Sequence, residues 1–299
     1  MEYEEQLLEL LDELQKETGI RFSLSDNAND EHETLRKLTK LIHRYRGDRN
    51  KAFFLKEFLT EEIDDKEIKS RAKSFRINEE APWSLIYIEF KKAYDTEAVS
   101  VLSSIYASGS DHMVEEDPKH LILLRQHKKS VTDEELSDIA TNIHDTLETE
   151  LMTSVKIAYD TVSSDFYGLQ NSFKHAKAAM DIRNIFHLGT DVIGYHELGL
   201  GKLVYSLPKE ACTEFIHDHL GDFDFEQIDS ETRHTINVFF EKGLSIAETA
   251  RELFVHRNTL VYRLDKLEKL TGLDIRRFSD AVTMEIALLM NELKKNNTP

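Results

Sequence analysis

The sequence predicts a multidomain protein in which an α+β domain precedes an all-α C-terminal domain. Strand-type and helix-type patterns alternate between residues 83 and 195, whereas only helical patterns and turns follow from residue 208 onward. The length of 299 residues suits two or three domains, each with its own core. We expect an N-terminal helical segment at residues 1-48, the α+β domain at 49-207 and the all-α domain at 208-299.

Helical patterns fill the first part of the chain. One face of a helix expected at residues 4–16 carries a stripe of leucines, namely Leu7, Leu8, Leu11 and Leu14. Further helices are expected at residues 35–45, 53–59 and 65–75. The leucine stripe has two open interpretations, because it could pair with another chain or pack on its own domain.

Five strands and three helices are expected in the middle of the chain, in the order β-α-β-β-α-β-α-β. The strands are expected at residues 83–90, 112–115, 120–124, 154–159 and 191–195. The helices are expected at residues 96–107, 133–151 and 166–186. Asp117, Pro118 and Lys119 are expected to form the turn between the second and third strands. This ferredoxin-like order predicts a sheet that contains antiparallel pairs and carries helices on one face.

The C-terminal domain is predicted to be a series of short helices. We expect helices at residues 210–220, 230–243 and 280–293. Ser230 and Ser279 stand at the starts of the last two and are the predicted N-caps, since a serine side chain accepts a bond from the first free N–H groups of a helix.

A pair of helices joined by a tight turn lies between those two. Ser245, followed three residues later by Glu248, predicts a capping box at the start of the first helix. Phe254 and Val255 are expected to make the turn. The second helix is expected at residues 256–270, where Thr271 and Gly272 follow as a stop signal.

The second helix of the pair has one apolar and one polar face. At about 100° per residue, Leu260, Leu264 and Leu267 fall on the side that faces the core. The other side and its flanks carry the polar residues Arg257, Asn258, Thr259, Tyr262, Arg263, Lys266 and Lys269. Arginine can bind guanine, asparagine can bind adenine, and a threonine methyl can contact the methyl of thymine. The pattern therefore predicts a DNA recognition helix.

An ordinary helical hairpin with a solvated polar face would share some of these features. Here the capping box, the short turn and the Arg-Asn-Thr run occur together with Ala250, a small residue that lets two helices cross closely. This combination favours DNA binding over the plain hairpin.

This pair of helices resembles the C-terminal helix-turn-helix of the PucR-type family, which includes purine-catabolism and sugar-diacid regulators. The resemblance rests on Val255-His-Arg-Asn-Thr-Leu260, Tyr262-Arg-Leu264, Leu267-Glu268 and Leu270-Thr-Gly272. The α+β domain is similar to the degenerate GGDEF-like domain of the same family. The resemblance implies a sequence-specific transcriptional regulator of metabolic genes that reads DNA with helix 256–270.

Eight residues form the expected DNA-binding set: Ser245, His256, Arg257, Asn258, Thr259, Tyr262, Arg263 and Lys266. The side chains at positions 257–259 and Tyr262 would meet base edges. Arg263 and Lys266, with the capped helix start at Ser245, would hold phosphates. Helical position alone leaves open whether Arg257 contacts a base or a phosphate.

Charge is distributed in a way that suits a local DNA contact. The whole chain carries a net charge of −18, with 38 Lys and Arg against 56 Asp and Glu. Residues 251–277 instead hold seven basic and four acidic residues. An acidic body repels DNA, so it would reduce non-specific binding while the basic stretch makes the contact.

Composition also indicates the compartment and limits the site chemistry. The single cysteine, Cys212, permits no intrachain disulfide and fits a reducing cytoplasm. The acidic N-terminus lacks the positive start of a signal peptide, and no apolar run approaches the roughly 20 residues of a membrane span. No Cys/His cluster has zinc spacing. We therefore expect a cytoplasmic protein with no membrane partner, no metal and no cofactor.

The GGDEF-like resemblance raises the alternative of a nucleotide-signalling enzyme or a nucleotide-binding protein of that type. A working diguanylate cyclase needs a Gly-Gly turn that lets the nucleotide approach the backbone. The corresponding residues here are Glu115-Glu-Asp-Pro-Lys119, which include no glycine. Their three acids could hold Mg²⁺, but a solvated acidic hairpin is favoured. We predict a non-catalytic sensor or dimerisation domain, with a regulator that binds a protein partner as a further alternative.

The number of chains on DNA follows from the size of the reading unit. One helix-turn-helix reads only a few base pairs, which is too little to select a genomic site. Binding to double-stranded DNA as a homodimer or higher homo-oligomer is therefore expected. A small-molecule effector is a possible further partner, and the sequence does not identify it.

Overall fold

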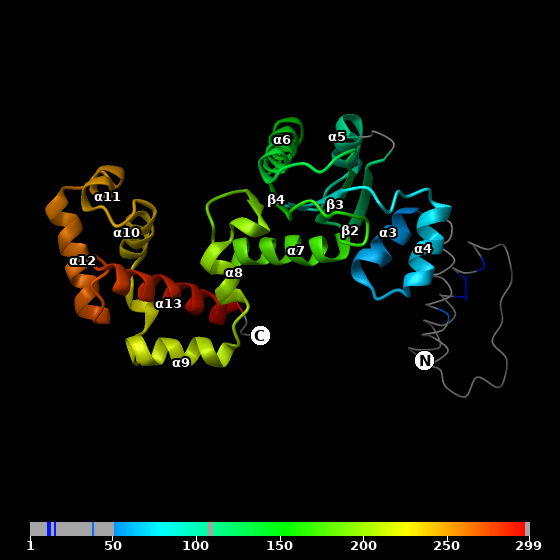
Figure 1. Ribbon diagram of the computed structural model, residues 1–299. Coiled ribbons are helices and arrows are strands. Elements are labelled where there is room, and N and C mark those ends of the chain that lie inside the picture. Colours follow the sequence, from blue (N-terminus) through cyan, green and yellow to red (C-terminus); the bar gives the residue numbers. More distant parts are fainter. Residues whose placement is uncertain (1–10, 13–14, 16–37, 39–50, 107–109, 297–299) are drawn as a thin grey trace. The chain divides into compact units, whose positions relative to one another are not determined.

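The computed structural model describes residues 11, 12, 15, 38, 51–106 and 110–296 (Figure 1). The predicted helices at residues 4–16 and 35–45, with the leucine stripe, lie outside the described residues apart from those single positions. The chain divides into two compact units. The first comprises Met1–Lys177 and Asp191–Tyr195, and the second comprises Ala178–Thr190 and His196–Pro299. The domain boundaries predicted at residues 48 and 207 stay predictions.

The first unit contains the α+β domain. Its elements are α3 (Lys51–Thr60), α4 (Asp65–Ser74), β1 (Trp83–Phe90), α5 (Thr96–Tyr106), β2 (His112–Asp117), β3 (His120–Gln126), α6 (Asp133–Leu151), β4 (Val155–Tyr159), the first part of α7 (Leu169–Ile185) and β5 (Val192–Gly194). The predicted order of strands and helices is confirmed, because β1 to β5 occur with α5, α6 and α7 between them as expected.

The five strands form one sheet in the order β2-β3-β1-β4-β5. Strand β1 is antiparallel to both β3 and β4, β2 is antiparallel to β3, and only β5 joins as a parallel neighbour of β4. The first four strands thus have the arrangement of a ferredoxin-like sheet. The predicted α+β class is confirmed.

Helices cover both faces of this sheet, so the prediction of a single covered face was wrong. Helices α5 and α6 pack on the face that carries Ile86 and Ile88. On the other face the ring of Phe173, in α7, meets the ring of Tyr87 edge-on at 6.1 Å. Figure 1 shows α6 and α7 on opposite sides of the strands. The nearly continuous apolar run of β1 is the reason, because a strand buried on both faces needs apolar residues at successive positions.

The second unit is helical. After the short turns η1 (Tyr195–Glu197) and η2 (Phe225–Gln227), its helices are α8 (Gly199–Tyr205), α9 (Lys209–Leu220), α10 (Ser230–Glu241), α11 (Ile246–Glu252), α12 (Arg257–Thr271) and α13 (Phe278–Asn296). Helix α13 packs against α8 and α9, whereas α10 contacts both α11 and α12. The predicted all-α C-terminal domain is confirmed.

Two predicted helix starts differ from the structure. The N-cap of α10 is Asp229 rather than Ser230, and its carboxylate accepts the N–H of Thr232 at 2.7 Å. Aspartate and serine are comparable N-caps, so two adjacent candidates cannot be ranked from the sequence. Helix α13 begins at Phe278 rather than after Ser279, because the carbonyl of Arg277 already accepts the N–H of Ala281 at 2.9 Å.

Candidate nucleic-acid interface

Helices α11 and α12 form the predicted helix-turn-helix. The chain leaves α10 through Gly243 and Leu244, which have φ of 58° and 62°. Such positive values permit the sharp reversal into α11, and glycine adopts them without strain. Phe254 makes the turn between α11 and α12 with φ of 53°, and its side chain is 95% exposed.

The predicted capping box of α11 is only half formed. The hydroxyl of Ser245 accepts the N–H of Glu248 at 3.4 Å, as expected. The N–H of Ser245 donates to the carbonyl of Lys242 at 3.2 Å instead of to Glu248. The Glu248 carboxylate pairs with Arg251 at 3.4 Å. Ser245 therefore acts as an N-cap through its side chain alone.

His256 is the N-cap of the recognition helix α12. Its Nδ1 accepts the N–H of Asn258 at 3.2 Å, so the imidazole presents a ring nitrogen without a proton to the helix start. The helix ends at Gly272, whose φ of 75° and N–H bond to the carbonyl of Glu268 at 2.7 Å form a left-handed cap. The predicted stop signal is confirmed.

The two faces of α12 are arranged as predicted. Leu260, Leu264 and Leu267 are buried. The side chains of Arg257, Asn258 and Thr259 are exposed, and that of Tyr262 is 69% exposed. Within the described ranges, none of these four side chains has a hydrogen-bonding or ionic partner. They are therefore available to an external molecule.

Arg263, a predicted phosphate ligand, is committed to α10. Its guanidinium Nη2 lies 2.5 Å from Oε1 of Glu231, and its Nη1 donates to the hydroxyl of Thr235 at 3.1 Å. The Arg263 side chain is only 17% exposed. These bonds fasten α12 to α10 across the surface of the unit.

Lys266, the other predicted phosphate ligand, is paired less tightly. Its Nζ lies 3.2 Å from Oδ2 of Asp229, and both side chains are half exposed. The backbone N–H and the hydroxyl of Thr232, followed by the ammonium of Lys266, lower the pKa of Asp229 to about 2. Asp229 is thus ionised near neutral pH and holds both the cap of α10 and the lysine.

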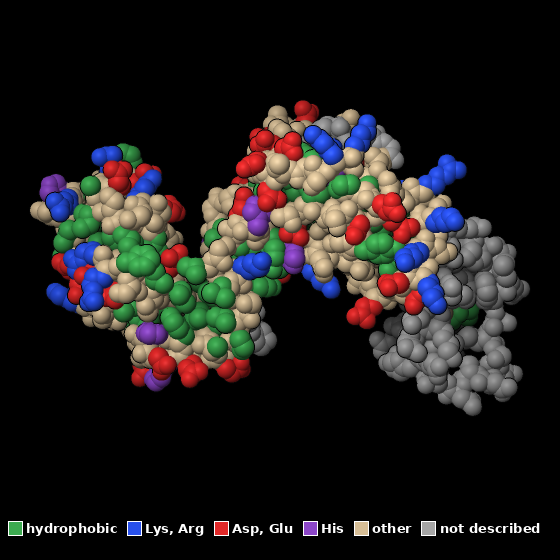
Figure 2. Space-filling view, viewed as in Figure 1, with side chains coloured by type: hydrophobic (Ala, Val, Ile, Leu, Met, Phe, Trp, Pro, Cys, Tyr) green, Lys and Arg blue, Asp and Glu red, His purple; other side chains and the backbone are tan. Residues whose placement is uncertain are grey.

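The structure shows a further cation whose role the sequence did not suggest. The guanidinium of Arg276 bonds to Asp265, Glu268 and Asp274 at 2.6, 2.6 and 2.5 Å. It fixes the end of α12 to the loop that precedes α13. In Figure 2, acidic side chains accordingly lie beside the basic ones over α12. Part of the local positive charge counted in the sequence is therefore neutralised within the unit.

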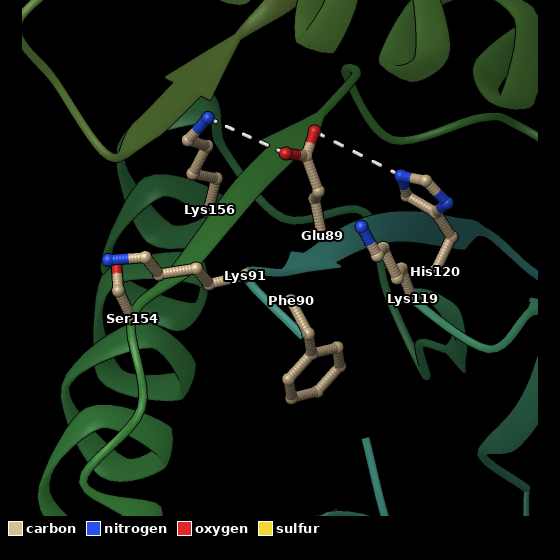
Figure 3. Close-up of a pocket in the computed structure, with 7 residues that line it drawn as sticks. All are labelled: Glu89, Phe90, Lys91, Lys119, His120, Ser154 and Lys156. Atoms are coloured by element: carbon tan, nitrogen blue, oxygen red, sulfur yellow. Dashed lines mark hydrogen bonds and ion pairs between the residues drawn. The ribbon is translucent and has the colours of Figure 1, made fainter. Parts of the chain in front are cut away.

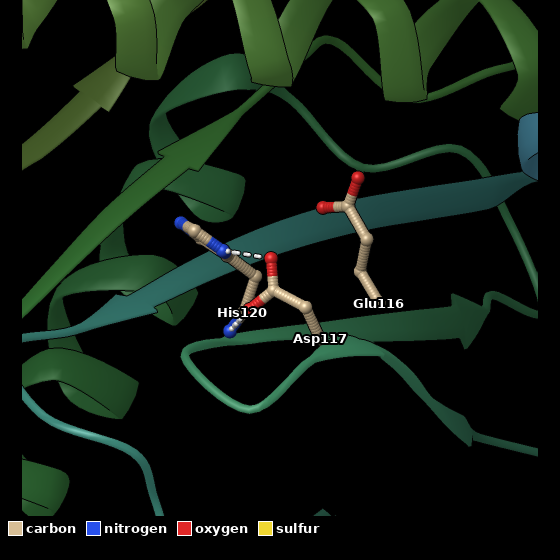
Figure 4. Close-up of side chains that lie close together, drawn as sticks. All are labelled: Glu116, Asp117 and His120. Atoms are coloured by element: carbon tan, nitrogen blue, oxygen red, sulfur yellow. Dashed lines mark hydrogen bonds and ion pairs between the residues drawn. The ribbon is translucent and has the colours of Figure 1, made fainter.

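The hairpin between β2 and β3 is the second place where chemistry could be expected. Glu116, Asp117 and His120 lie close enough together to hold a metal ion (Figure 4). However, Glu116 already accepts from the hydroxyl of Tyr87 and the ammonium of Lys177, both at 2.5 Å. Both oxygens of the Glu116 carboxylate therefore already have protein donors, so the geometry favours a structural cluster over a metal site.

Asp117 is held within the hairpin in the same way. One of its oxygens accepts the N–H groups of Lys119 and His120, at 2.7 and 3.0 Å, and the other meets Nδ1 of His120 at 2.7 Å. Partial burial opposes ionisation of Asp117, but these donors outweigh it and lower the pKa. The Asp117 carboxylate thus stabilises the turn at Pro118 that the sequence predicts.

Comparison with known proteins identifies both parts of the chain. Residues 232–290 match the PucR C-terminal helix-turn-helix domain, and residues 60–182 match the GGDEF-like domain. These matches define a protein that combines a GGDEF-like domain with a helix-turn-helix. The chain thus carries a PucR-type C-terminal helix-turn-helix and a GGDEF-like domain, and the predicted resemblance is confirmed in these two domains.

Named relatives agree with these domain matches. The chain is 26% identical over 248 residues to the purine catabolism regulatory protein of Bacillus subtilis (strain 168), which covers 77% of this chain and 46% of that protein. It is 40% identical over 60 residues to the carbohydrate diacid regulator of Escherichia coli (strain K12), covering 20% of this chain and 16% of that one. The chain thus spans less than half the length of these relatives.

A solved structure of similar extent is the regulator of polyketide synthase expression from Bifidobacterium adolescentis. The alignment covers 85% of this chain and 94% of that one, at 19% identity and a TM-score of 0.42. In the part of the chain that the structure describes, no helix is both long enough and apolar enough to cross a membrane.

Proposed function

We propose that this chain is a sequence-specific, DNA-binding transcriptional regulator of metabolic genes that reads double-stranded DNA with α12. The observation that carries the proposal is the exposed, unpartnered set of side chains on the first turns of α12, opposite a buried leucine stripe. It lies within the residues that match the PucR C-terminal helix-turn-helix domain. The names of the relatives, both regulators, support the same function.

Four side chains of α12 are proposed to meet base edges in the major groove. Asn258 can make a paired contact with adenine, Arg257 with guanine, and the methyl of Thr259 can meet a thymine methyl. Tyr262 lies one turn further along the same face, and its hydroxyl can reach a base or a sugar. The position of a recognition helix with its N-terminal residues against the bases supports these roles.

The cations behind this face are proposed to have different roles. Lys266 can exchange its half-exposed partner Asp229 for a phosphate oxygen at little cost. Arg263 is mostly buried, and a phosphate would have to displace Glu231 to reach it. We therefore assign Arg263 first to holding α12 on α10. The helix starts at Ser245 and His256 are proposed to lie beside the DNA backbone.

A regulator built on one such unit per chain would act as a dimer or higher homo-oligomer. Two recognition helices related by a two-fold axis would read an inverted repeat with half-sites about 10 base pairs apart. The GGDEF-like domain is proposed to serve in the cytoplasm as a dimerisation domain or as a sensor of a small-molecule effector. The names of two relatives, both regulators, support a regulatory role for the chain.

The GGDEF-like domain is proposed to be non-catalytic. The turn between β2 and β3 contains Pro118 and no glycine, so a nucleotide cannot approach its backbone as it would a Gly-Gly turn. The nearby carboxylates of Glu116 and Asp117 are engaged by protein donors. Both features count against a nucleotide-signalling enzyme.

Selection of bound fragments from genomic DNA by the purified full-length chain tests the proposed function. We expect recovery of a small family of fragments that share an inverted repeat. The Asn258→Ala variant should recover them poorly, whereas Asn142→Ala, the same change on an exposed turn of α6, should recover them normally. Recovery of DNA without a shared sequence would contradict the proposal.

A further inference from the structure

We propose that the first unit binds a hydroxylated phosphate monoester in a lysine-lined pocket at one end of its sheet. The pocket has a volume of about 540 Å³, within the range of about 300–1,000 Å³ that is usual for small-molecule sites. It is separate from the helix-turn-helix and does not depend on the proposed DNA binding. Figure 3 shows the residues that line it.

The antiparallel sheet brings three strand ends together at this place. The end of β1 lies between the starts of β3 and β4, so that Glu89 pairs in register with His120 on one side and Lys156 on the other. The N–H of Phe90 donates to the carbonyl of Lys119 at 2.9 Å. The walls of the pocket are therefore held by the backbone of the sheet.

The lining is basic although the chain is strongly acidic. Lys91, Lys119 and Lys156 line the pocket together with one carboxylate, that of Glu89, and Figure 3 shows Lys91 extending toward Ser154. The ammonium of Lys156 lies 3.5 Å from Glu89. Within the described part of the chain, the ammonium groups of Lys91 and Lys119 have no ion-pair partner. Two cations are thus left for an external anion.

The two cations favour phosphate over carboxylate. An ammonium is a compact charge without the planar fork that makes arginine a partner for carboxylates, and it binds phosphate as a point charge. Lys91 follows β1 and Lys119 precedes β3, so they reach the pocket from neighbouring strand ends. A phosphate can accept from both once these flexible side chains turn toward it, and from the hydroxyl of Ser154, beside which the Lys91 ammonium lies in Figure 3.

Glu89 adds a second requirement for the ligand, which is a hydroxyl group beside the phosphate. Its carboxylate is flanked by Lys156 and by Nε2 of His120 at 3.9 Å, as the dashed lines in Figure 3 show. The bond from Nδ1 of His120 to Asp117 turns Nε2 toward Glu89. The ring of His120 also stacks on that of Tyr87 at 5.4 Å. A carboxylate fixed in this way would repel a second anionic group but would accept a bond from a ligand hydroxyl.

Calorimetric titration of the full-length chain with inorganic phosphate and with glycerol 3-phosphate tests the proposal. We expect saturable binding of both, with glycerol 3-phosphate bound about tenfold more tightly because its hydroxyls can donate to Glu89. Added NaCl should weaken both, since the contact is ionic. The double variant Lys91→Gln/Lys119→Gln should weaken both by about tenfold or more.

Two further variants separate the site from general charge effects. Lys69→Gln/Lys73→Gln makes the same charge change on exposed positions of α4 and should leave both affinities unchanged. Glu89→Gln should reduce the preference for glycerol 3-phosphate over inorganic phosphate. Absence of saturable binding, an equal loss in the α4 variant, or equal affinity for the two compounds would overturn the proposal.

Discussion

The contact of Arg263 with α10 leads to a prediction that separates two roles for this arginine. As a structural tie, Arg263 holds α12 through Glu231 and Thr235. As a phosphate ligand, it would instead contribute to the salt dependence of DNA binding. The substitution Arg263→Met keeps most of the side-chain length and removes both interactions. Arg257→Met is the matched control, because Arg257 is exposed on the same helix.

The expected cost follows from the exposure of each partner. The bond to the buried Thr235 contributes about 1 kcal/mol. The carboxylate of Glu231 is 71% exposed, so after solvent screening this pair adds at most about 0.5 kcal/mol. The total of roughly 1–1.5 kcal/mol corresponds to about a five- to tenfold increase in local opening of α12.

Hydrogen–deuterium exchange, read peptide by peptide, measures this opening directly. Exchange of α12 and of the facing part of α10 should rise in Arg263→Met and stay unchanged in Arg257→Met. The slope of log affinity against log salt should be the same for Arg263→Met as for the unaltered chain. Unchanged exchange together with a slope reduced by about one would refute the structural role and make Arg263 a phosphate ligand.

Three further predictions concern catalysis, pH and assembly. The purified chain should form no cyclic di-GMP from GTP with Mg²⁺ or Mn²⁺; product that is lost on mutating residues 115–117 would contradict the non-catalytic role. Burial, with the nearby charge of Lys51, lowers the pKa of His112 from 6.5 to about 4. The unfolded chain therefore takes up a proton that the folded chain does not, so that stability is full above about pH 6.5 and is lost as the pH falls toward 4, by roughly 1 kcal/mol at pH 5 after solvent screening of the partly exposed ring. Unfolding can be followed by the fluorescence of the single tryptophan Trp83, whose ring lies 6.0 Å from that of His112. The free energy of unfolding measured in this way should fall between about pH 6.5 and pH 5, and it should fall less in His112→Gln. Sedimentation of the full-length chain on its selected operator should give at least two chains per site, and one chain per site would contradict the assembly.

Local periodicity was sufficient for much of the fold. The bounds of β1 and α6 agree with the sequence, because an uninterrupted apolar run and a helical leucine–isoleucine stripe are strong local signals. The buried face of α12 could be predicted for the same reason. The second covered face of the sheet was missed although the nearly continuous apolar run of β1 indicates it, because a strand buried on both faces has apolar residues at successive positions instead of alternating ones.

The sequence could not show which side chains far apart in the chain form ion pairs. Arg263 and Glu231 are 32 positions apart, and Lys266 and Asp229 are 37 apart. Helical position placed both cations near the DNA-facing surface but gave no indication of the acids that α10 brings to them. The same limit applies to the pocket, where only the register of β1 with β3 and β4 places Glu89 between His120 and Lys156.

The base preference of single-residue variants tests the recognition role of α12 most directly. Binding of the full-length chain would be measured on the selected operator and on operators with each base pair changed in turn. Asn258→Ala should cost about 1–3 kcal/mol and relax the preference at one position. Lys266→Ala should weaken binding to all sequences alike and reduce the salt slope by about one. Binding by both variants with unaltered affinity, base preference and salt slope would contradict the assignment of α12 as the reading helix.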